Sequence, residues 1–202
     1  MQSLDTAPNV SFSPLLHRYT LEEFFTLPDP DDRSHYELIG GFLFMCPPPD
    51  PPHGLIDSRL NKSLVQFLLA HEIPGEAHHP REPIYTDLHA GIYLEPDMMF
   101  VSEELGKRMG RKRTSADIVF EYLSVSNAVY DRTTKAHTYL ALGVRELWLI
   151  DPSVSTIEVR HASEHKGKPA WETWRYSDGD WAESRVLSGW RVSVSELFES
   201  LI

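Results

Sequence analysis

The chain has 202 residues, of which 41% are hydrophobic and 24% are charged, as expected for a globular protein with one well-buried core. Its formal net charge of −11 argues against binding nucleic acid through bulk electrostatics, because phosphate groups are bound mainly by lysine and arginine. The single cysteine, Cys46, excludes an intramolecular disulfide and a zinc site made of cysteines alone.

We interpret Cys46 as a small buried hydrophobe rather than a reactive thiol, and such sparse cysteine usage is typical of a reducing compartment. The N-terminus lacks the basic and then apolar order of a signal peptide, and no apolar stretch approaches the ~20 residues of a membrane span. We therefore expect a cytoplasmic protein with no membrane contact.

Residues 1–17 have no hydrophobic period and contain two prolines, so we expect a flexible lead-in, followed by a single domain over residues 18–202. Thr20 and Glu23 form a capping box, which predicts a short helix. Residues 36–46 read YELIGGFLFMC, which predicts two strands joined by a turn at the glycine pair.

A run of prolines over residues 47–52 predicts an extended connector, because proline interrupts both helices and β-ladders. Apolar residues then recur every three or four positions over residues 54–70, which predicts an amphipathic helix packed on the core. His53, at the start of this helix, could bind an anionic ligand, although an exposed loop histidine is the simpler interpretation. We interpret His78 and His79 as loop residues.

Short strands are predicted at residues 83–85 and 92–94. Asp97 follows them and either begins the apolar strand of residues 98–101 or belongs to a Pro-Asp turn. A short helix is predicted to start at Ser102.

Charge is unevenly distributed along the chain. Residues 1–100 contain 5 Lys or Arg against 15 Asp or Glu, whereas residues 101–202 contain 14 against 15. A phosphate-facing surface should therefore come from the second half, although a solvated loop is the simpler interpretation of a basic cluster. The densest basic cluster is Lys107, Arg108, Arg111, Lys112 and Arg113.

The most informative stretch places a carboxylate inside a short apolar run. Residues 118–123 read IVFEYL, which is typical of a strand covered on both faces. An ionised Glu121 there costs several kcal/mol unless a cation, a donor or a proton compensates it. A helix is predicted over residues 131–142, and three of its residues are spaced four apart on one face: Asp131, Lys135 and Tyr139.

The remaining elements are predicted to complete the sheet. Residues 146–150 are expected to form another buried strand, and residues 156–160, 171–175 and 181–185 to form outer antiparallel strands. Ser193 opens a second capping box, which predicts a terminal helix.

Glu37, Asp97 and Glu121 each stand in or beside a separate predicted strand. Neighbouring strands lie about 4.8 Å apart, so carboxylates on adjacent strands can surround one hard cation such as Mg²⁺. With a cation bound, the carboxylates can remain ionised and a bound water becomes a better nucleophile. Lys135 could then neutralise a phosphate or orient the attacking water. This chemistry is phosphodiester hydrolysis.

The order of these residues resembles the Uma-type restriction endonucleases of the PD-(D/E)XK nuclease superfamily. The resemblance covers residues 36–152 and rests on YELIGG from Tyr36, His53, Pro96-Asp97, EYLS from Glu121, Asp131 with Lys135 and Tyr139, GVRELW from Gly143, and Asp151-Pro152. It implies an α/β fold with a restriction-endonuclease-like core, in which helices flank a mixed central β-sheet. It also implies scission of DNA.

The resemblance assigns roles to individual residues. Asp97 and Glu121 would bind Mg²⁺ or Mn²⁺, Glu37 would be an accessory acid, and Lys135 would be the lysine of the signature and stabilise charge on the scissile phosphate. In the plain signature the lysine lies two residues after the acid, but this chain has Leu123 there, so Lys135 must reach back from the following helix.

Other positions also depart from the family pattern. Gly40 stands where family members commonly have an aspartate. Val125 and Asn127 depart from the Ser-Pro-Ser/Thr stretch that usually follows the strand. An ion pair of Lys135 with Glu121 or Asp131, or an N-cap role for Asp131, would explain the same residues without catalysis.

We therefore predict a metal-dependent DNA endonuclease with His53 and Tyr139 as further substrate contacts, although Tyr139 could equally serve packing. A homodimer is expected, because cutting two strands with one site each requires two sites. One alternative is an inactive nuclease fold that binds nucleic acid or a protein partner, which the acidic charge favours. Another is the same metal cluster acting on RNA or a small phosphate ester.

Overall fold

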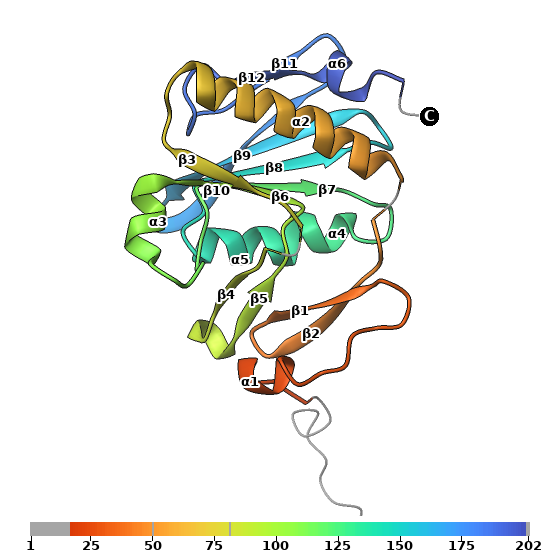
Figure 1. Ribbon diagram of the computed structural model, residues 1–202, viewed down its shortest axis with the longest axis vertical. Coiled ribbons are helices and arrows are strands. Elements are labelled where there is room, and N and C mark those ends of the chain that lie inside the picture. The colour runs from red at the N-terminus through yellow and green to blue at the C-terminus, as the bar shows by residue number, and fades with distance from the viewer. Residues whose placement is uncertain (1–16, 50, 81, 201–202) are drawn as a thin grey trace, which may run out of the picture.

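The computed structural model describes residues 17–49, 51–80 and 82–200, and its centre is a six-stranded mixed sheet (Figure 1). The strand order is β10-β9-β8-β7-β6-β3, in which β7 and β8 are parallel and the other neighbours are antiparallel. The strands are β3 (Gly75–His78), β6 (Met98–Ser102), β7 (Ile118–Tyr122), β8 (Glu146–Asp151), β9 (Thr156–His165) and β10 (Lys168–Tyr176). This sheet confirms the predicted architecture, while the expected lead-in lies outside the described residues except for its last residue.

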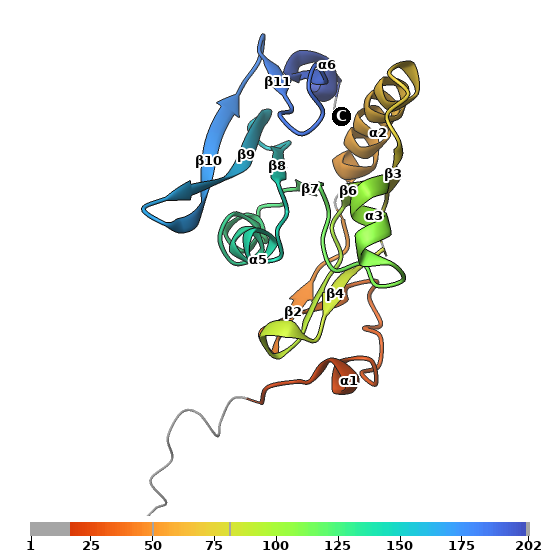
Figure 2. The same cartoon turned by 90° about the vertical axis from the view of Figure 1, so that its left-hand side faces the viewer.

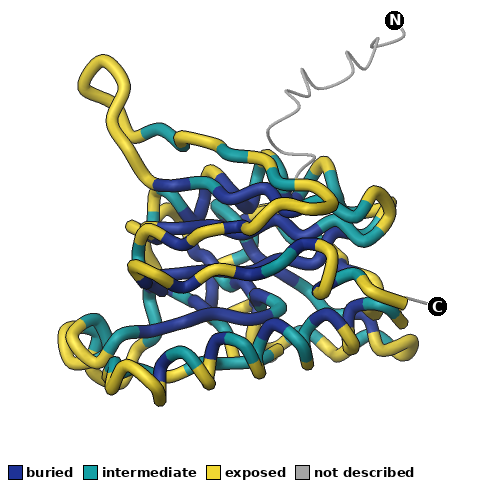
Figure 3. Tube along the Cα trace, turned by 90° about the horizontal axis from the view of Figure 1, so that it is seen from above, coloured by how far each residue is buried: buried dark blue, intermediate teal, exposed yellow. Residues whose placement is uncertain are grey.

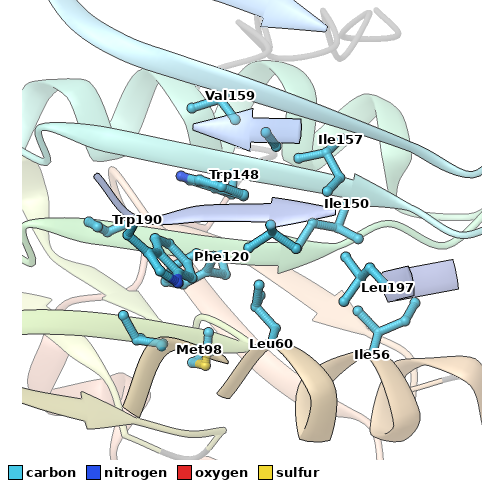
Figure 4. Packing of buried hydrophobic residues seen from close by; sticks show 14 of the residues in the cluster. Ile56, Leu60, Met98, Phe120, Trp148, Ile150, Ile157, Val159, Trp190 and Leu197 are labelled. Atoms are coloured by element: carbon cyan, nitrogen blue, oxygen red, sulfur yellow. The ribbon is translucent and has the colours of Figure 1, made fainter. Parts of the chain in front are cut away.

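Strand β7 is buried at all five residues because helices cover both faces of the sheet. Helix α2 (Pro51–Ala70) packs on one face and helix α5 (Ala136–Ala141) on the other (Figure 2). Phe120 belongs to the core beneath α2 (Figure 4), whereas Val119 packs with Tyr139 on the α5 side. Buried residues therefore follow the central strands, and exposed residues lie at the periphery (Figure 3).

Leu60 of α2 should be a principal contributor to stability, because its side chain is fully buried in the core that contains Phe120 and Trp148. We expect Leu60→Ala to lower the free energy of unfolding by about 2–5 kcal/mol, measured by urea denaturation. The matched control is Leu69→Ala on the same helix, where 74% of the residue is exposed, and it should change stability by less than about 0.5 kcal/mol. Equal losses for the two variants would contradict this packing.

Helix α2 begins at Pro51, so the prediction that residues 47–52 form an extended connector is wrong for its last two prolines. Proline fits the first turn of a helix, because its fixed φ is helical and the missing N–H would have no partner there. His53 consequently lies in this first turn and is only 6% exposed, so its interpretation as an exposed loop histidine is wrong. The predicted apolar stripe is confirmed by the buried residues Ile56, Leu60, Leu64 and Leu68.

A smaller antiparallel sheet of four strands, in the order β2-β1-β5-β4, lies beside the central sheet (Figure 1). Its strands are β1 (His35–Ile39), β2 (Phe42–Cys46), β4 (Ile84–Thr86) and β5 (Ile92–Leu94). The predicted hairpin of β1 and β2 is confirmed, and its turn uses Gly40 and Gly41 with φ of 60° and 82°. Glycine suits this turn because a side chain is strained at such angles. Cys46 is buried at the end of β2, as predicted.

The helix predicted over residues 131–142 starts earlier, as α4 (Ala128–Tyr130), and passes through one turn of π-helix, η3 (Asp131–Lys135), into α5. Asp131 therefore lies inside the helical segment, and the alternative in which it caps the N-terminus is wrong. Single π-helical turns within α-helices are frequent at functional sites.

The remaining elements lie around these two sheets, and both hydrogen bonds of the capping box predicted at Thr20 are present. Strand β3 is short and polar, so its sequence did not predict it, and His78 belongs to this strand rather than to a loop. Across the described part of the chain, none of the helices is both long and apolar enough to cross a membrane. The other elements are α1 (Leu21–Phe24), η2 (Leu88–Ala90), α3 (Glu103–Met109), β11 (Trp181–Glu183), β12 (Arg191–Ser193) and α6 (Val194–Phe198).

Candidate active site

Two predicted carboxylates meet because the strands that carry them are antiparallel neighbours. Met98 pairs with Phe120, so one residue further along Asp97 lies across from Glu121. The backbone N–H of Tyr122 donates a hydrogen bond of 2.7 Å to Asp97 Oδ2, which fixes this carboxylate beside the end of β7. Asp97 and Glu121 line one pocket of about 60 Å³, so they face the same environment.

Lys135 lies at the centre of the carboxyl groups. Its ammonium Nζ lies 2.8 Å from Glu121 Oε1, 3.2 Å from Glu37 Oε1 and 3.8 Å from Asp131 Oδ1, and the residue is only 4% exposed. Burial alone would lower the pKa of Lys135, but the charges of Glu121 and Glu37 outweigh burial and raise this pKa well above its usual range. The lysine is therefore a fixed positive charge at neutral pH and cannot act as a general base there.

Glu37 has no exposed surface and is surrounded by donors. Its carboxylate accepts hydrogen bonds from the backbone N–H of Glu95 at 2.9 Å and the hydroxyl of Tyr130 at 3.0 Å, besides its contact with Lys135. The thiol of Cys46 donates a further, longer bond of 3.3 Å. Burial alone would raise the pKa of Glu37, but the charge of Lys135 and the Glu95 N–H lower it below its usual value.

Lys135 and Tyr139 both contact Oε1 of Glu121. Val119 and Leu123, two residues to either side, belong to the core beneath α5, so the Glu121 side chain points toward the face from which Lys135 and Tyr139 approach. Its Oε1 atom accepts the 2.5 Å hydrogen bond of the Tyr139 hydroxyl. Among the described residues, no donor is hydrogen-bonded to Glu121 Oε2 or to Asp97 Oδ1.

Negative charge is in excess in this cluster, where Glu37, Asp97, Glu121 and Asp131 surround one ammonium. Burial raises the pKa of Asp97 and of Asp131 to about 6, and it raises that of Glu121 well above the usual value, because Lys135 offsets the loss of hydration only in part. The carboxyl groups therefore compete for one cation.

The buried charge of Asp131 should make the free energy of unfolding depend on pH. Because its pKa rises from 3.8 in the unfolded chain to about 6 in the folded protein, ionisation of Asp131 destabilises the fold increasingly as pH rises through this window. We expect Asp131→Asn to raise the free energy of unfolding by up to about 3 kcal/mol at pH 8, with about half of that gain left at pH 5. Urea denaturation at the two pH values measures it. The exposed control, Asp29→Asn, should show no such pH-dependent gain.

Two predicted substrate contacts occupy different positions. The Tyr139 side chain is fully buried and its hydroxyl donates a hydrogen bond to Glu121, while a contact of Tyr139 with a substrate stays a prediction. His53 lines the pocket, and its ring contacts that of Tyr122 edge-on, with centroids 5.9 Å apart. Its role as a substrate contact stays a prediction.

Sequence reasoning missed several supporting residues. Tyr130 donates to Glu37 and stacks on Phe44, with ring centroids 4.6 Å apart. Asp57 accepts a 2.9 Å hydrogen bond from the hydroxyl of Tyr122 and lies 3.2 Å from His79. The only signal for Asp57 was its position four residues after His53, which places both on one face of α2.

The basic cluster of residues 107–113 lies away from these carboxylates. It belongs to α3 and the segment after it, beyond the C-terminal end of β6, whereas Asp97 precedes the N-terminal end of that strand. Three of its cations are engaged in ion pairs: Lys107 with Glu103, Lys112 with Asp87, and Arg113 with Glu82. These positions indicate that Lys107, Lys112 and Arg113 pair with nearby acidic residues of the protein rather than belong to the carboxylate site.

Comparison with known proteins identifies the family. The family model described as "Uma2: Putative restriction endonuclease" matches residues 21–195. The chain belongs to the Uma2 family. A solved structure described as "a putative nuclease belonging to DUF820 from Anabaena variabilis" aligns with this Uma2 protein over 89% of its length and 97% of that chain, with a TM-score of 0.69 and 21% sequence identity. At this identity the likeness shows a shared fold, and a comparison with curated proteins found no match.

Membership of the Uma2 family confirms the resemblance seen in the sequence, and the shared fold confirms the predicted architecture. In this Uma2 protein the predicted residues Glu37, Asp97, Glu121 and Lys135 come together from β1, the start of β6, β7 and η3. Their assembly is a property of the fold, and their chemical roles stay predictions.

Proposed function

We propose that this Uma2 protein is a nuclease that hydrolyses phosphodiester bonds of DNA with the help of Mg²⁺ or Mn²⁺, and that it acts as a homodimer. The observation that supports this most directly is the opposed pair of Asp97 and Glu121 in one pocket, with the buried ammonium of Lys135 beside them. The family description and the nuclease-like fold of the Anabaena protein agree with this reaction class.

The residues fit a hard divalent cation. Asp97 and Glu121 offer carboxylate oxygens, which are the ligands that Mg²⁺ prefers, and each keeps one oxygen without a hydrogen-bond donor among the described residues. Burial raises the pKa of both groups, and a bound cation would favour their charged forms. When bound, the ion would lower the pKa of a water molecule and supply the nucleophile.

Lys135 and Tyr139 orient the carboxylate of Glu121, and Lys135 also provides a positive charge at the site. Lys135 and Tyr139 bind the same oxygen of Glu121, and this carboxylate lines the pocket. Lys135 stays protonated at neutral pH, so its contribution is electrostatic: it favours the negative charge that develops on a phosphate in the transition state. Glu37 holds the other side of Lys135 and keeps the ammonium in this position.

Nicking of supercoiled plasmid DNA tests the proposal. Conversion to the open-circular form should require Mg²⁺ or Mn²⁺, stop on addition of EDTA and resume when excess Mg²⁺ is restored. Cleavage that persists in EDTA would reject the metal-dependent mechanism. If nicking is absent while Mn²⁺ binding depends on Asp97 and Glu121, DNA is the wrong substrate, and RNA or a phosphate ester should be tested next. If neither nicking nor such binding occurs, the protein is an inactive nuclease fold.

A further inference from the structure

A second group of potential metal ligands lies on the β1–β2 hairpin. His35 pairs directly across from Cys46, and Glu37 lies two residues after His35, so all three side chains belong to one face of the hairpin. One ligand atom from each residue lies within 4.8 Å of the others, and Cys46 Sγ is 3.3 Å from Glu37 Oε2. Separate strand positions, rather than a flexible loop, hold the three groups together.

The donor set selects a different cation from that of the Asp97 and Glu121 pair. An imidazole nitrogen, a carboxylate oxygen and a thiolate sulfur are ligands of Zn²⁺, whereas Mg²⁺ prefers oxygen alone. Ligand atoms of a tetrahedral zinc site must lie within about 4 Å of one another, given metal–ligand bonds of about 2.0–2.3 Å, so the observed spacing needs only a small side-chain adjustment.

The group is also reachable by an ion. His35 and Cys46 line the same small pocket as Asp97 and Glu121, so a cation that enters the pocket can reach nitrogen and sulfur ligands as well as carboxylate oxygens. Three protein ligands would leave a fourth position open toward the pocket, as in zinc sites that keep a water molecule.

We propose that His35, Glu37 and Cys46 form a binding site for Zn²⁺ or a similar soft divalent cation, separate from the magnesium site. The Cys46 S–H group donates a hydrogen bond to Glu37. A cation must therefore replace the thiol proton, which leaves to solvent as the sulfur–metal bond forms. Glu37 would serve this site and Lys135 together, so occupancy would bear on the proposed nuclease site; that last consequence alone rests on the proposed function.

Titration of the full-length protein with Co²⁺ tests the site without any activity measurement, because a thiolate bound to cobalt gives a charge-transfer absorption in the near ultraviolet. We expect this band to saturate at one Co²⁺ per chain and to disappear when Zn²⁺ is added. Cys46→Ser should remove the band, and His35→Ala should weaken Co²⁺ binding by at least about tenfold.

Two further variants separate this site from its surroundings. Asp97→Asn removes a predicted magnesium ligand and should leave the thiolate band in place, and His137→Ala, at an exposed position of α5, should leave Co²⁺ affinity unchanged. Circular dichroism establishes that each variant is folded, and His35→Ala carries the test if Cys46→Ser fails to fold. Absence of the band in the wild-type protein, or unchanged affinity in folded His35→Ala, would overturn the proposal.

Discussion

Asp97→Asn should reduce the rate of Mg²⁺-dependent plasmid nicking by at least about 10³-fold, which corresponds to about 4 kcal/mol of transition-state stabilisation. The substitution keeps the shape of the side chain and an oxygen for the Tyr122 N–H, but it removes one of the carboxylate charges that line the pocket. Because the pKa of Asp97 is raised to about 6, removal of its charge should also leave the fold as stable as the wild type, or more stable, at pH 8. Nicking assays and thermal melting of one preparation measure both effects.

The matched control for this experiment is the exposed Asp29→Asn, which removes one acidic charge away from the site and should leave the nicking rate within about twofold. Glu121→Gln should behave like Asp97→Asn, because the two carboxylates face the same pocket. If Asp97→Asn is folded and nicks DNA at the wild-type rate, the activity lies elsewhere in the molecule.

Lys135→Met should lower the free energy of unfolding by about 3–5 kcal/mol, the largest loss of stability that we expect from one charged side chain in this protein. Lys135 is 4% exposed and its ammonium lies within 4.0 Å of three carboxylates, so its removal leaves buried negative charges without a partner. Methionine has nearly the same length and no charge, which isolates the electrostatic effect from packing. Urea denaturation at pH 7.5 measures the change.

The exposed Lys107→Met is the control, because its i,i+4 ion pair with Glu103 should contribute less than about 1 kcal/mol. Adding Glu37→Gln to Lys135→Met should recover part of the lost stability, since one of the unpaired carboxylates becomes neutral. A loss below about 1 kcal/mol for Lys135→Met would show that the buried carboxyl groups are protonated and need no cation.

Several elements could be predicted from local sequence because their causes are local. The apolar run of residues 118–122 predicts a strand covered on both faces, and all five of its residues are buried. Gly40 and Gly41 predict a hairpin turn because only glycine adopts positive φ there without strain, and the turn forms at that pair. Thr20 and Glu23 predict a helix start through hydrogen bonds between near neighbours.

Other features depend on partners that are distant in the chain. Strand β3 (GEAH) has no apolar pattern and exists because its backbone pairs with β6 at the sheet edge. The donors of Glu37 are equally remote: the Glu95 N–H lies 58 residues away, and the Tyr130 hydroxyl 93 residues away. No spacing rule links such residues. The sequence therefore predicts Glu37 as a site residue but does not predict the groups that donate hydrogen bonds to it.

Local sequence identifies the groups that need compensation: Glu121 lies in an apolar strand and Lys135 in the following helix, and a buried charge requires a partner in any fold. The partners that compensate these charges come together through long-range strand pairing and helix packing. The antiparallel pairing of β6 with β7 sets Asp97 across from Glu121, and the helical segment after β7 brings one ammonium among several carboxylates. Pairing register and helix docking are properties of the whole chain, because they are fixed by the burial of two apolar cores at once.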